Sequence, residues 1–128
     1  MAISAQQRKD LIAAQQGELD AVQMYLALAE VAKEERDREA FKRLAAEEGR
    51  HAAVFYHYTK QKLSAKNTLA KALVALYKVS GKKRLYPFIA KGEYAAVKKY
   101  EPLIADFPEV KAVKDDEKRH GDEVMRLL

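Results

Sequence analysis

The sequence predicts an all-α protein, a four-helix bundle with one long crossover that contains a short helix. Proline and glycine are scarce, with 3 and 5 residues, whereas alanine, leucine, glutamate and lysine, which favour helices, are abundant. No stretch alternates apolar and polar residues as a half-buried strand does. Apolar residues recur instead at steps of three and four, which is the spacing of one face of a helix.

The first two long helices are predicted from their capping residues. Ser4 and Gln7 form a capping-box pattern, and the helix that follows should run to about Ala32. After a short charged turn, Asp37 is a suitable N-cap for a second helix that ends near Gln61. The two helices should therefore form an antiparallel hairpin.

The remaining elements are predicted from further caps, glycine and proline. Ser64 or Asn67 can cap a short amphipathic helix that Gly81 ends, and a third long helix should start near Pro87. Pro102 and the Asp-Phe-Pro turn after it should end that helix and start a fourth, which runs to the C-terminus. The long middle connection, between the second and third long helices, lets the third run parallel to the second. This is the ferritin-like variant of four-helix topology.

Length and composition narrow the possible functions. The chain has 128 residues, and we expect residues 1–128 to form a single domain. It has no cysteine, which excludes disulfides, a thiol nucleophile and a Cys-ligated iron centre, so a bound metal must be held by Asp, Glu or His. The N-terminus lacks an apolar signal region and no run of about 18 apolar residues occurs, so we expect a cytoplasmic protein without a membrane span.

Basic residues are concentrated in the crossover. The formal charge is +5, yet nine basic residues and no acid lie from Lys60 to Lys91, which leaves 15 basic against 19 acidic residues elsewhere. Because the basic charge is confined to one segment, we do not expect nucleic-acid binding. It is typical of a solvated connecting helix, and a docking surface for an acidic partner or a membrane is the alternative.

Carboxylates and imidazoles interrupt the apolar stripes of all four long helices. The second and fourth helices each carry Glu-x-x-His in mid-stripe, where a spacing of three places both side chains on one face. The first and third helices each carry one glutamate. The interrupting residues are Glu18, Glu48, His51, Glu93, Glu117 and His120.

These side chains should meet at one level of the bundle. The midpoint of Glu18 and Glu48 falls at position 33, inside the first predicted turn, and the midpoint of Glu93 and Glu117 falls beside the second. Residues equidistant from the turn of an antiparallel hairpin lie at the same height. All six groups can therefore converge.

Four buried carboxylates need positive charge, because each uncompensated charge costs on the order of several kcal/mol. No Lys or Arg occupies the four stripes. Two divalent cations would balance the four glutamates, and the imidazoles would complete nitrogen and oxygen ligand shells. This donor set is the one described for dimetal carboxylate bundles. We therefore predict two metal ions, with iron favoured and manganese or zinc as alternatives.

Two tyrosines and one histidine lie near the predicted site residues in the sequence. Tyr25 and Tyr100 follow Glu18 and Glu93 by seven residues on the same stripes. Each either packs in the core or bonds a ligand carboxylate across the bundle. His57 lies off the stripe of its helix and is expected on the surface or at an interface.

The most specific segments of the chain are Gln16-Gly17-Glu18 with Tyr25, Glu47-Glu48-Gly49-Arg50-His51, Gly92-Glu93-Tyr94 and Asp116-Glu117-Lys118-Arg119-His120. Through these segments, the chain resembles the rubrerythrin family of the ferritin-like superfamily, and the likeness covers essentially its full length. The resemblance implies that the four glutamates are iron ligands, that those of the Glu-x-x-His pairs bridge, and that each histidine contacts one iron. Rubrerythrins couple oxidation of a diiron centre to reduction of hydrogen peroxide, and relatives oxidise ferrous iron.

Two departures from the family bear on mechanism. Rubrerythrins carry a rubredoxin domain with four cysteines that supplies electrons, and this chain has none, so a separate donor such as a rubredoxin-like protein or a reductase is expected. The family also has a glutamate three residues after the third-helix ligand, where this chain has Ala96. This departure weakens the expectation of a redox-linked ligand exchange and of peroxidase activity.

The leading hypothesis is a diiron oxidoreductase that reduces hydrogen peroxide or dioxygen bound between the metals. A ferroxidase is the next hypothesis, and manganese catalase-like dismutation is a minor one. A noncatalytic helical module that binds acidic partners through the Lys60 to Lys91 segment is the rival from another class. The crossover helix has an apolar stripe of its own, so a homodimer is also expected, with hairpin exchange through the long connection as one way of pairing.

Overall fold

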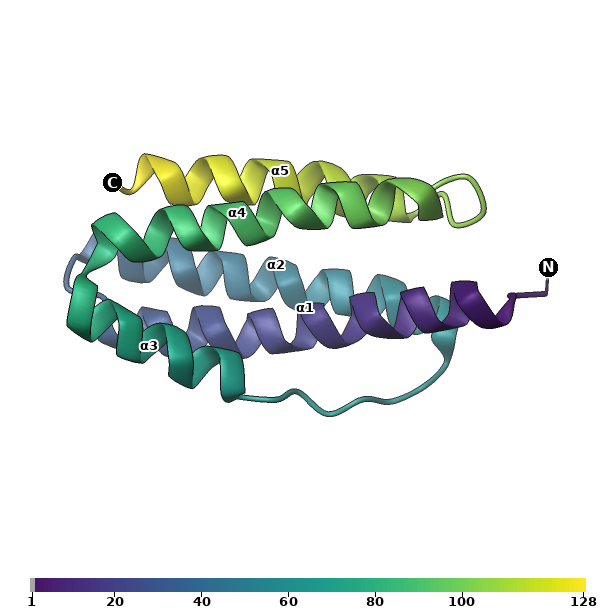
Figure 1. Cartoon of the computed structure of the whole chain (residues 1–128), viewed down its shortest axis with the longest axis horizontal. Helices are drawn as coiled ribbons and strands as arrows, with labels where there is room; N and C mark the ends of the chain where they lie inside the picture. Colours follow the sequence, from purple (N-terminus) through teal and green to yellow (C-terminus); the bar gives the residue numbers. More distant parts are fainter. Residues whose placement is uncertain (1) are drawn as a thin grey trace.

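The computed structural model describes residues 2–128, which form helices joined by short turns and one long crossover (Figure 1). Within these residues no strand occurs, which confirms the predicted all-α class, and no helix is long and apolar enough to cross a membrane. The elements are α1 (Ala5–Val31), α2 (Glu35–Thr59), α3 (Thr68–Ser80), α4 (Lys82–Tyr100), the 3-10 helix η1 (Glu101–Leu103) and α5 (Val110–Arg126).

The first hairpin begins with the predicted capping box. The Gln7 backbone N–H donates to the Ser4 hydroxyl at 3.0 Å, and the Ser4 N–H donates to the Gln7 side chain at 3.0 Å. The prediction of Asp37 as the cap of α2 is wrong, because α2 already begins at Glu35. The buried Asp37 carboxylate instead accepts hydrogen bonds from Tyr86 Oη at 2.8 Å and Lys82 Nζ at 3.1 Å, which tie α2 to α4.

The crossover leaves α2 at Lys60, which has a left-handed φ of 54°. The irregular segment that follows is held along α1 by side-chain amides. Gln15 Nε2 donates to the Gln61 carbonyl at 2.8 Å, and Gln16 Nε2 donates to the Ser64 carbonyl at 2.9 Å. The segment then leads into α3, which packs against α1 and the start of α4.

Gly81 ends α3 as predicted, with a positive φ of 75° that favours glycine. The predicted start of the next helix at Pro87 is wrong, because α4 begins at Lys82 and continues through the proline. The missing N–H of Pro87 costs a helix about 3 kcal/mol. Burial of Leu85 and Tyr86 offsets this cost, since a fully buried apolar side chain contributes about 1.5–3 kcal/mol.

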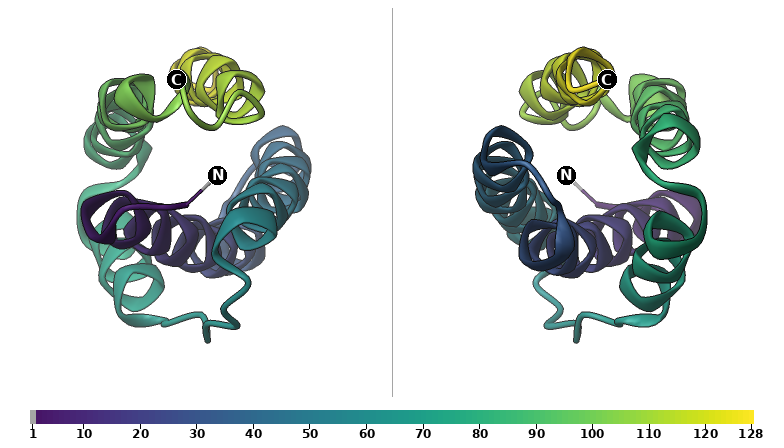
Figure 2. Two further views of the ribbon diagram at one scale, coloured as in Figure 1. Left: turned by 90° about the vertical axis from the view of Figure 1, so that its right-hand side faces the viewer. Right: turned by 90° about the vertical axis from the view of Figure 1, so that its left-hand side faces the viewer.

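Two antiparallel hairpins, α1 with α2 and α4 with α5, face each other across the bundle (Figure 2). Helix α4 runs in the same direction as α2, as a single long crossover requires (Figure 1). The arrangement is the predicted ferritin-like topology. Helix α3 packs against the side of α1.

The apolar core is divided into two clusters along the bundle. One includes Tyr25, Phe41 and Tyr86, and the other includes Leu11 and Phe55. On α1 and on α2, the predicted metal-site residues lie between the residues of the two clusters. The structure therefore places a polar layer between two apolar ones.

Candidate metal centre

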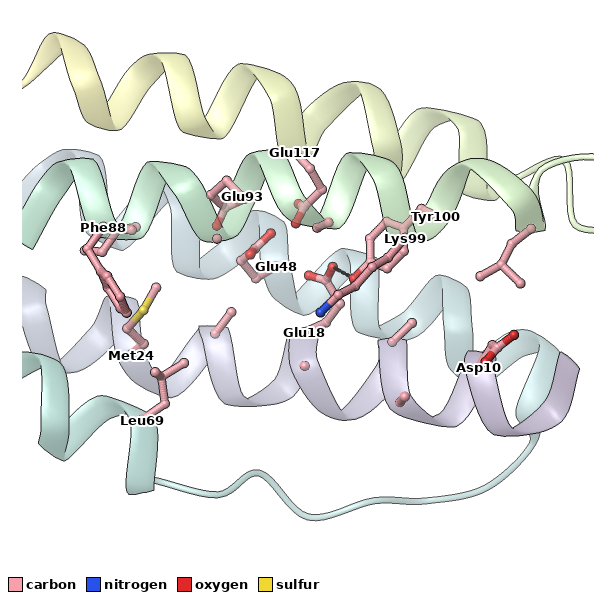
Figure 3. A pocket seen from close by; sticks show the side chains of 18 of the residues that line it. Asp10, Glu18, Met24, Glu48, Leu69, Phe88, Glu93, Lys99, Tyr100 and Glu117 are labelled. Atoms are coloured by element: carbon pink, nitrogen blue, oxygen red, sulfur yellow. Dashed lines mark hydrogen bonds between the residues drawn. The ribbon is translucent and has the colours of Figure 1, made fainter. Parts of the chain in front are cut away.

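Four helices bring the six predicted site residues together in the middle of the bundle. The carboxylates of the four glutamates face one another in the space between α1 and α4 (Figure 3). None of the six exposes more than 6% of its surface. The contributing residues are Glu18 of α1, Glu48 and His51 of α2, Glu93 of α4, and Glu117 and His120 of α5.

The two histidines mark two halves of the cluster. His51 Nδ1 lies 3.4 Å from Glu18 Oε2, and His120 Nδ1 lies 3.5 Å from Glu93 Oε2. The two imidazole rings are stacked, with centroids 5.4 Å apart. Each histidine thus has one glutamate of its own, supplied by the other helix of its hairpin.

The glutamates of the two Glu-x-x-His pairs lie between these halves. Glu48 Oε1 is 3.0 Å from His51 Nδ1 and 3.2 Å from His120 Nδ1. Glu117 Oε1 is 3.0 Å and 3.4 Å from the same two nitrogens. The donor atoms of these four residues all lie within 4.8 Å of one another, so they form one metal-binding cluster.

One atom of each of the six residues lacks a hydrogen-bond partner, because the close approaches between them do not have hydrogen-bond geometry. Buried polar atoms are nearly always paired in native proteins, so six at one point need a physical explanation. Carboxylate oxygens and imidazole nitrogens are donors that iron, manganese and zinc accept, and the residues present fit such ions. The atoms are Glu18 Oε2, Glu48 Oε1, His51 Nδ1, Glu93 Oε2, Glu117 Oε1 and His120 Nδ1.

The two tyrosines on the site stripes bond across the bundle. Tyr25 Oη donates to Glu93 Oε1 at 2.7 Å, and Tyr100 Oη donates to Glu18 Oε1 at 2.7 Å. Each bond leaves the other carboxylate oxygen facing the cluster. Burial and the nearby carboxylates raise the pKa of both tyrosines, so their hydroxyls stay protonated.

Sequence reasoning missed two acids that hold the outer nitrogens of the histidines. His51 Nε2 lies 2.8 Å from Asp116 Oδ2, and His120 Nε2 lies 3.0 Å from Glu47 Oε1. Arg119 donates to both carboxylates and links them. An Nε2–H that donates outward leaves Nδ1 facing the cluster, which is the orientation a metal ligand needs.

The signal for these acids was present, since an acidic residue directly precedes each Glu-x-x-His. Adjacent residues on a helix point about 100° apart, so Glu47 and Asp116 fall outside the stripes that identified the cluster. The pKa of Glu47 shows how strongly its carboxylate is held. Burial alone would raise this pKa, but hydrogen bonds to Arg119 and His120 lower it to about 2.

The cluster glutamates differ in their preference for a proton. Burial raises the pKa of Glu18 and Glu48, and raises that of Glu93 to about 7. Burial would also raise the pKa of Glu117, but close contacts with His120 and His51 lower it to about 2. Glu117 is therefore the glutamate that best keeps its negative charge in the protein alone.

Both cluster histidines favour the protonated form in the protein alone. Burial would lower the pKa of His51, but contacts with the carboxylates of Glu117, Glu18 and Glu48 raise it to about 12. The pKa of His120 is raised in the same way, against the effect of burial. Protons on imidazoles and carboxylates thus supply the charge balance that metal ions would otherwise provide.

His57 and Ala96 lie outside the cluster. His57 is exposed and its ring contacts Tyr58, with centroids 5.3 Å apart, so it is a surface residue. Ala96 is half-buried and lines a cavity of about 450 Å³ beside the glutamates, where it supplies no donor atom.

The fold and the buried cluster define the class, a ferritin-like helical bundle with a carboxylate and histidine metal-binding cluster. Comparison with known families agrees, because the model of the family Rubrerythrin matches residues 9–128. The chain belongs to the rubrerythrin family of diiron proteins. No curated protein and no solved structure gives a significant match.

Proposed function

We propose that this protein is a non-haem diiron oxidoreductase that reduces hydrogen peroxide with electrons from a separate donor protein. The observation that carries the proposal is the set of six unpartnered atoms, one from each site residue, enclosed at one level of the bundle. Two divalent ions would balance the four glutamates. The proposed ligands are Glu18, Glu48, His51, Glu93, Glu117 and His120.

The distances suggest two metal positions. Glu18 and His51 would hold one ion, and Glu93 and His120 the other, because the atoms of each pair approach within 3.5 Å. The glutamates of the Glu-x-x-His pairs would bridge the ions, because each approaches both histidines. Iron is proposed because the family is a diiron family and because zinc has no redox chemistry. Manganese is the alternative, because it accepts the same donors.

The chain supplies the surroundings for the reaction. When bound, two ferrous ions would supply the two electrons that, with two protons, convert hydrogen peroxide into two molecules of water. Tyr25 and Tyr100 hold protons on hydroxyls 2.7 Å from Glu93 and Glu18, and the cavity between α1 and α4 gives a small oxidant access to the carboxylates. Because the chain has no cysteine, electrons for further cycles must come from a rubredoxin-like protein or a reductase.

Metal content tests the ligand set. Glu117→Ala should lose at least one of two ions per chain by elemental analysis, because Glu117 is proposed to bridge. Glu30→Ala is the control, since Glu30 is exposed on α1, and it should keep both ions. Two ions per chain in Glu117→Ala would show that the ligand set is wrong.

Peroxide stoichiometry tests the reaction. The reduced, iron-loaded protein should consume about one equivalent of hydrogen peroxide per site, because peroxide takes up two electrons. It should turn over repeatedly only when a reductase or a rubredoxin-like donor is added. Sustained oxygen release without a donor would indicate catalase chemistry and reject the proposal.

Ferroxidase activity is the second candidate function. It is favoured by the position of the four glutamates on a cavity through which a ferrous ion could reach them, and by Ala96, which adds no further carboxylate. Oxidation of added ferrous iron well beyond two ions per chain, with dioxygen as oxidant and no peroxide turnover, would support this function over peroxide reduction.

A further inference from the structure

The cavity between α1 and α4 is much larger than a peroxide molecule. Its volume is about 450 Å³. Hydrogen peroxide has two heavy atoms and needs roughly 60 Å³, twice the share of one water in the liquid. A volume of this size lies in the range of pockets that bind small organic molecules, roughly 300–1,000 Å³.

The two ends of the cavity differ in chemistry. Figure 3 shows the glutamates in the middle, with Asp10 toward one end and Met24, Leu69 and Phe88 toward the other. Water in the apolar end would find few hydrogen-bond partners. A hydrocarbon group would displace that water favourably.

Small residues form part of the wall that α1 contributes to the cavity. Ala13, Gly17 and Ala21 are spaced by four and line the cavity on one face of the helix. A Cβ added at Gly17 would meet nothing within 4 Å, so space is open beside Glu18. The four glutamates that line this space are at least 94% buried, and each has one oxygen without a hydrogen-bond partner. The space beside the small residues therefore adjoins carboxylate oxygens that a bound ligand could contact.

We propose that the site also accepts organic hydroperoxides, with the hydroperoxide group at the glutamate cluster and the hydrocarbon body toward Met24, Leu69 and Phe88. The inference rests on the proposed function and names a second substrate class for the same site. When bound, the reduced metal ions would supply the two electrons that cleave the O–O bond, the external donor would replace these electrons, and two protons would be taken up. The products are one alcohol and one water, so atoms and electrons balance.

The apolar end is the part of the cavity that distinguishes the two substrates. Hydrogen peroxide needs only the carboxylate region, whereas an aryl or alkyl group must pass Ala21, which lies between Glu18 and Met24 on α1. Ala21→Phe should therefore obstruct the organic substrate alone. Ala53→Phe is the control, because Ala53 is exposed on α2 and does not line the cavity, so the same ring is added outside it.

The experiment compares cumene hydroperoxide with hydrogen peroxide in single turnovers of the reduced, iron-loaded protein. Both should oxidise the site, and Ala21→Phe should slow only cumene hydroperoxide, by about tenfold or more. Ala53→Phe should slow neither. A binding measurement on the unreduced protein complements the rates. The product alcohol, 2-phenyl-2-propanol, should give saturation-transfer NMR signals with the wild-type protein that Ala21→Phe weakens.

The outcomes separate this inference from the proposed function. Reduction of hydrogen peroxide without reduction of cumene hydroperoxide or binding of the alcohol would overturn the inference and leave the proposed function standing. Equal slowing of both peroxides by Ala21→Phe would also overturn it, as would a second copy of the chain that covers the cavity and excludes the alcohol. Failure with both peroxides would overturn the proposed function.

Discussion

Removal of metal ions should make the stability of this protein strongly dependent on pH. The pKa of His51 is raised to about 12 and that of His120 is raised as well, whereas a histidine in the unfolded chain titrates near 6.5. Between pH 8 and pH 7, where histidines of the unfolded chain are mostly neutral, the folded protein therefore binds up to two protons that the unfolded chain does not. A raised folded-state pKa stabilises the fold at low pH, and this stability is lost as the pH rises toward the folded value.

The size of the effect follows from the number of protons. One proton bound only in the folded state changes the free energy of unfolding by about 1.4 kcal/mol per pH unit, so two histidines give at most about 2.8 kcal/mol per pH unit. Glu93, with a pKa of about 7, also makes the fold more stable as the pH falls. Glu117, with a pKa of about 2, has the opposite effect on stability, but only at acidic pH. For a chain of this size, the change from pH 8 to pH 7 should raise the melting temperature on the order of 10 °C.

The assay is a series of melting curves, followed by circular dichroism, of chelator-treated protein at constant ionic strength. His51→Gln should remove about half of the slope between pH 8 and pH 7, because one of the two protons is lost. His57→Gln is the control, since His57 is exposed, and it should leave the slope unchanged. A melting temperature that stays constant or falls on acidification would refute the crowding of carboxylates around the histidines.

Three further predictions concern single contacts and assembly. Tyr100→Phe removes the hydrogen bond to Glu18 and should weaken metal affinity by about tenfold in a chelator competition, whereas Tyr56→Phe on the surface should not change it. Gly121→Ala should lower the free energy of unfolding in urea by about 1 kcal/mol, because its Cβ would overlap the Tyr94 ring, and unchanged stability would mean that the ring moves aside without cost. Exposed apolar side chains on α3 support the expected homodimer, and a monomer by light scattering at micromolar concentration would contradict it.

The convergence of the cluster could be predicted from sequence because the spacing of a helix is regular. A polar pair three residues apart in an apolar stripe must lie on the buried face, and hairpin symmetry then sets its height. The helix starts were less certain, because capping preferences are weak compared with tertiary contacts. Asp37 has the chemistry of a cap, yet its carboxylate is used by Lys82 and Tyr86, and Pro87 lies within α4 because burial of its neighbours outweighs its missing N–H.

The supporting acids could not be predicted in the same way, because each acts on a residue of the other hairpin. Glu47 on α2 reaches His120 on α5, and Asp116 on α5 reaches His51 on α2. Such contacts depend on how closely the two hairpins approach, which no periodicity within a helix records. Arg119 donates hydrogen bonds to both acids. Its role is also difficult to predict from sequence, because nearly half of its side chain is exposed, as in an ordinary surface arginine.

Four contacts that orient the glutamates and histidines of the cluster each join one hairpin to the other. The tyrosine of α1 bonds the glutamate of α4, the tyrosine of α4 bonds the glutamate of α1, and the acids of α2 and α5 hold each other's histidines. One hairpin alone therefore cannot orient its own glutamate and histidine. Two chains that exchange hairpins would still bring one first hairpin against one second hairpin, so all four bonds would form. The irregular segment between α2 and α3 is the place where such chains would cross. The cluster thus requires a pair of complementary hairpins but does not require that they belong to one chain.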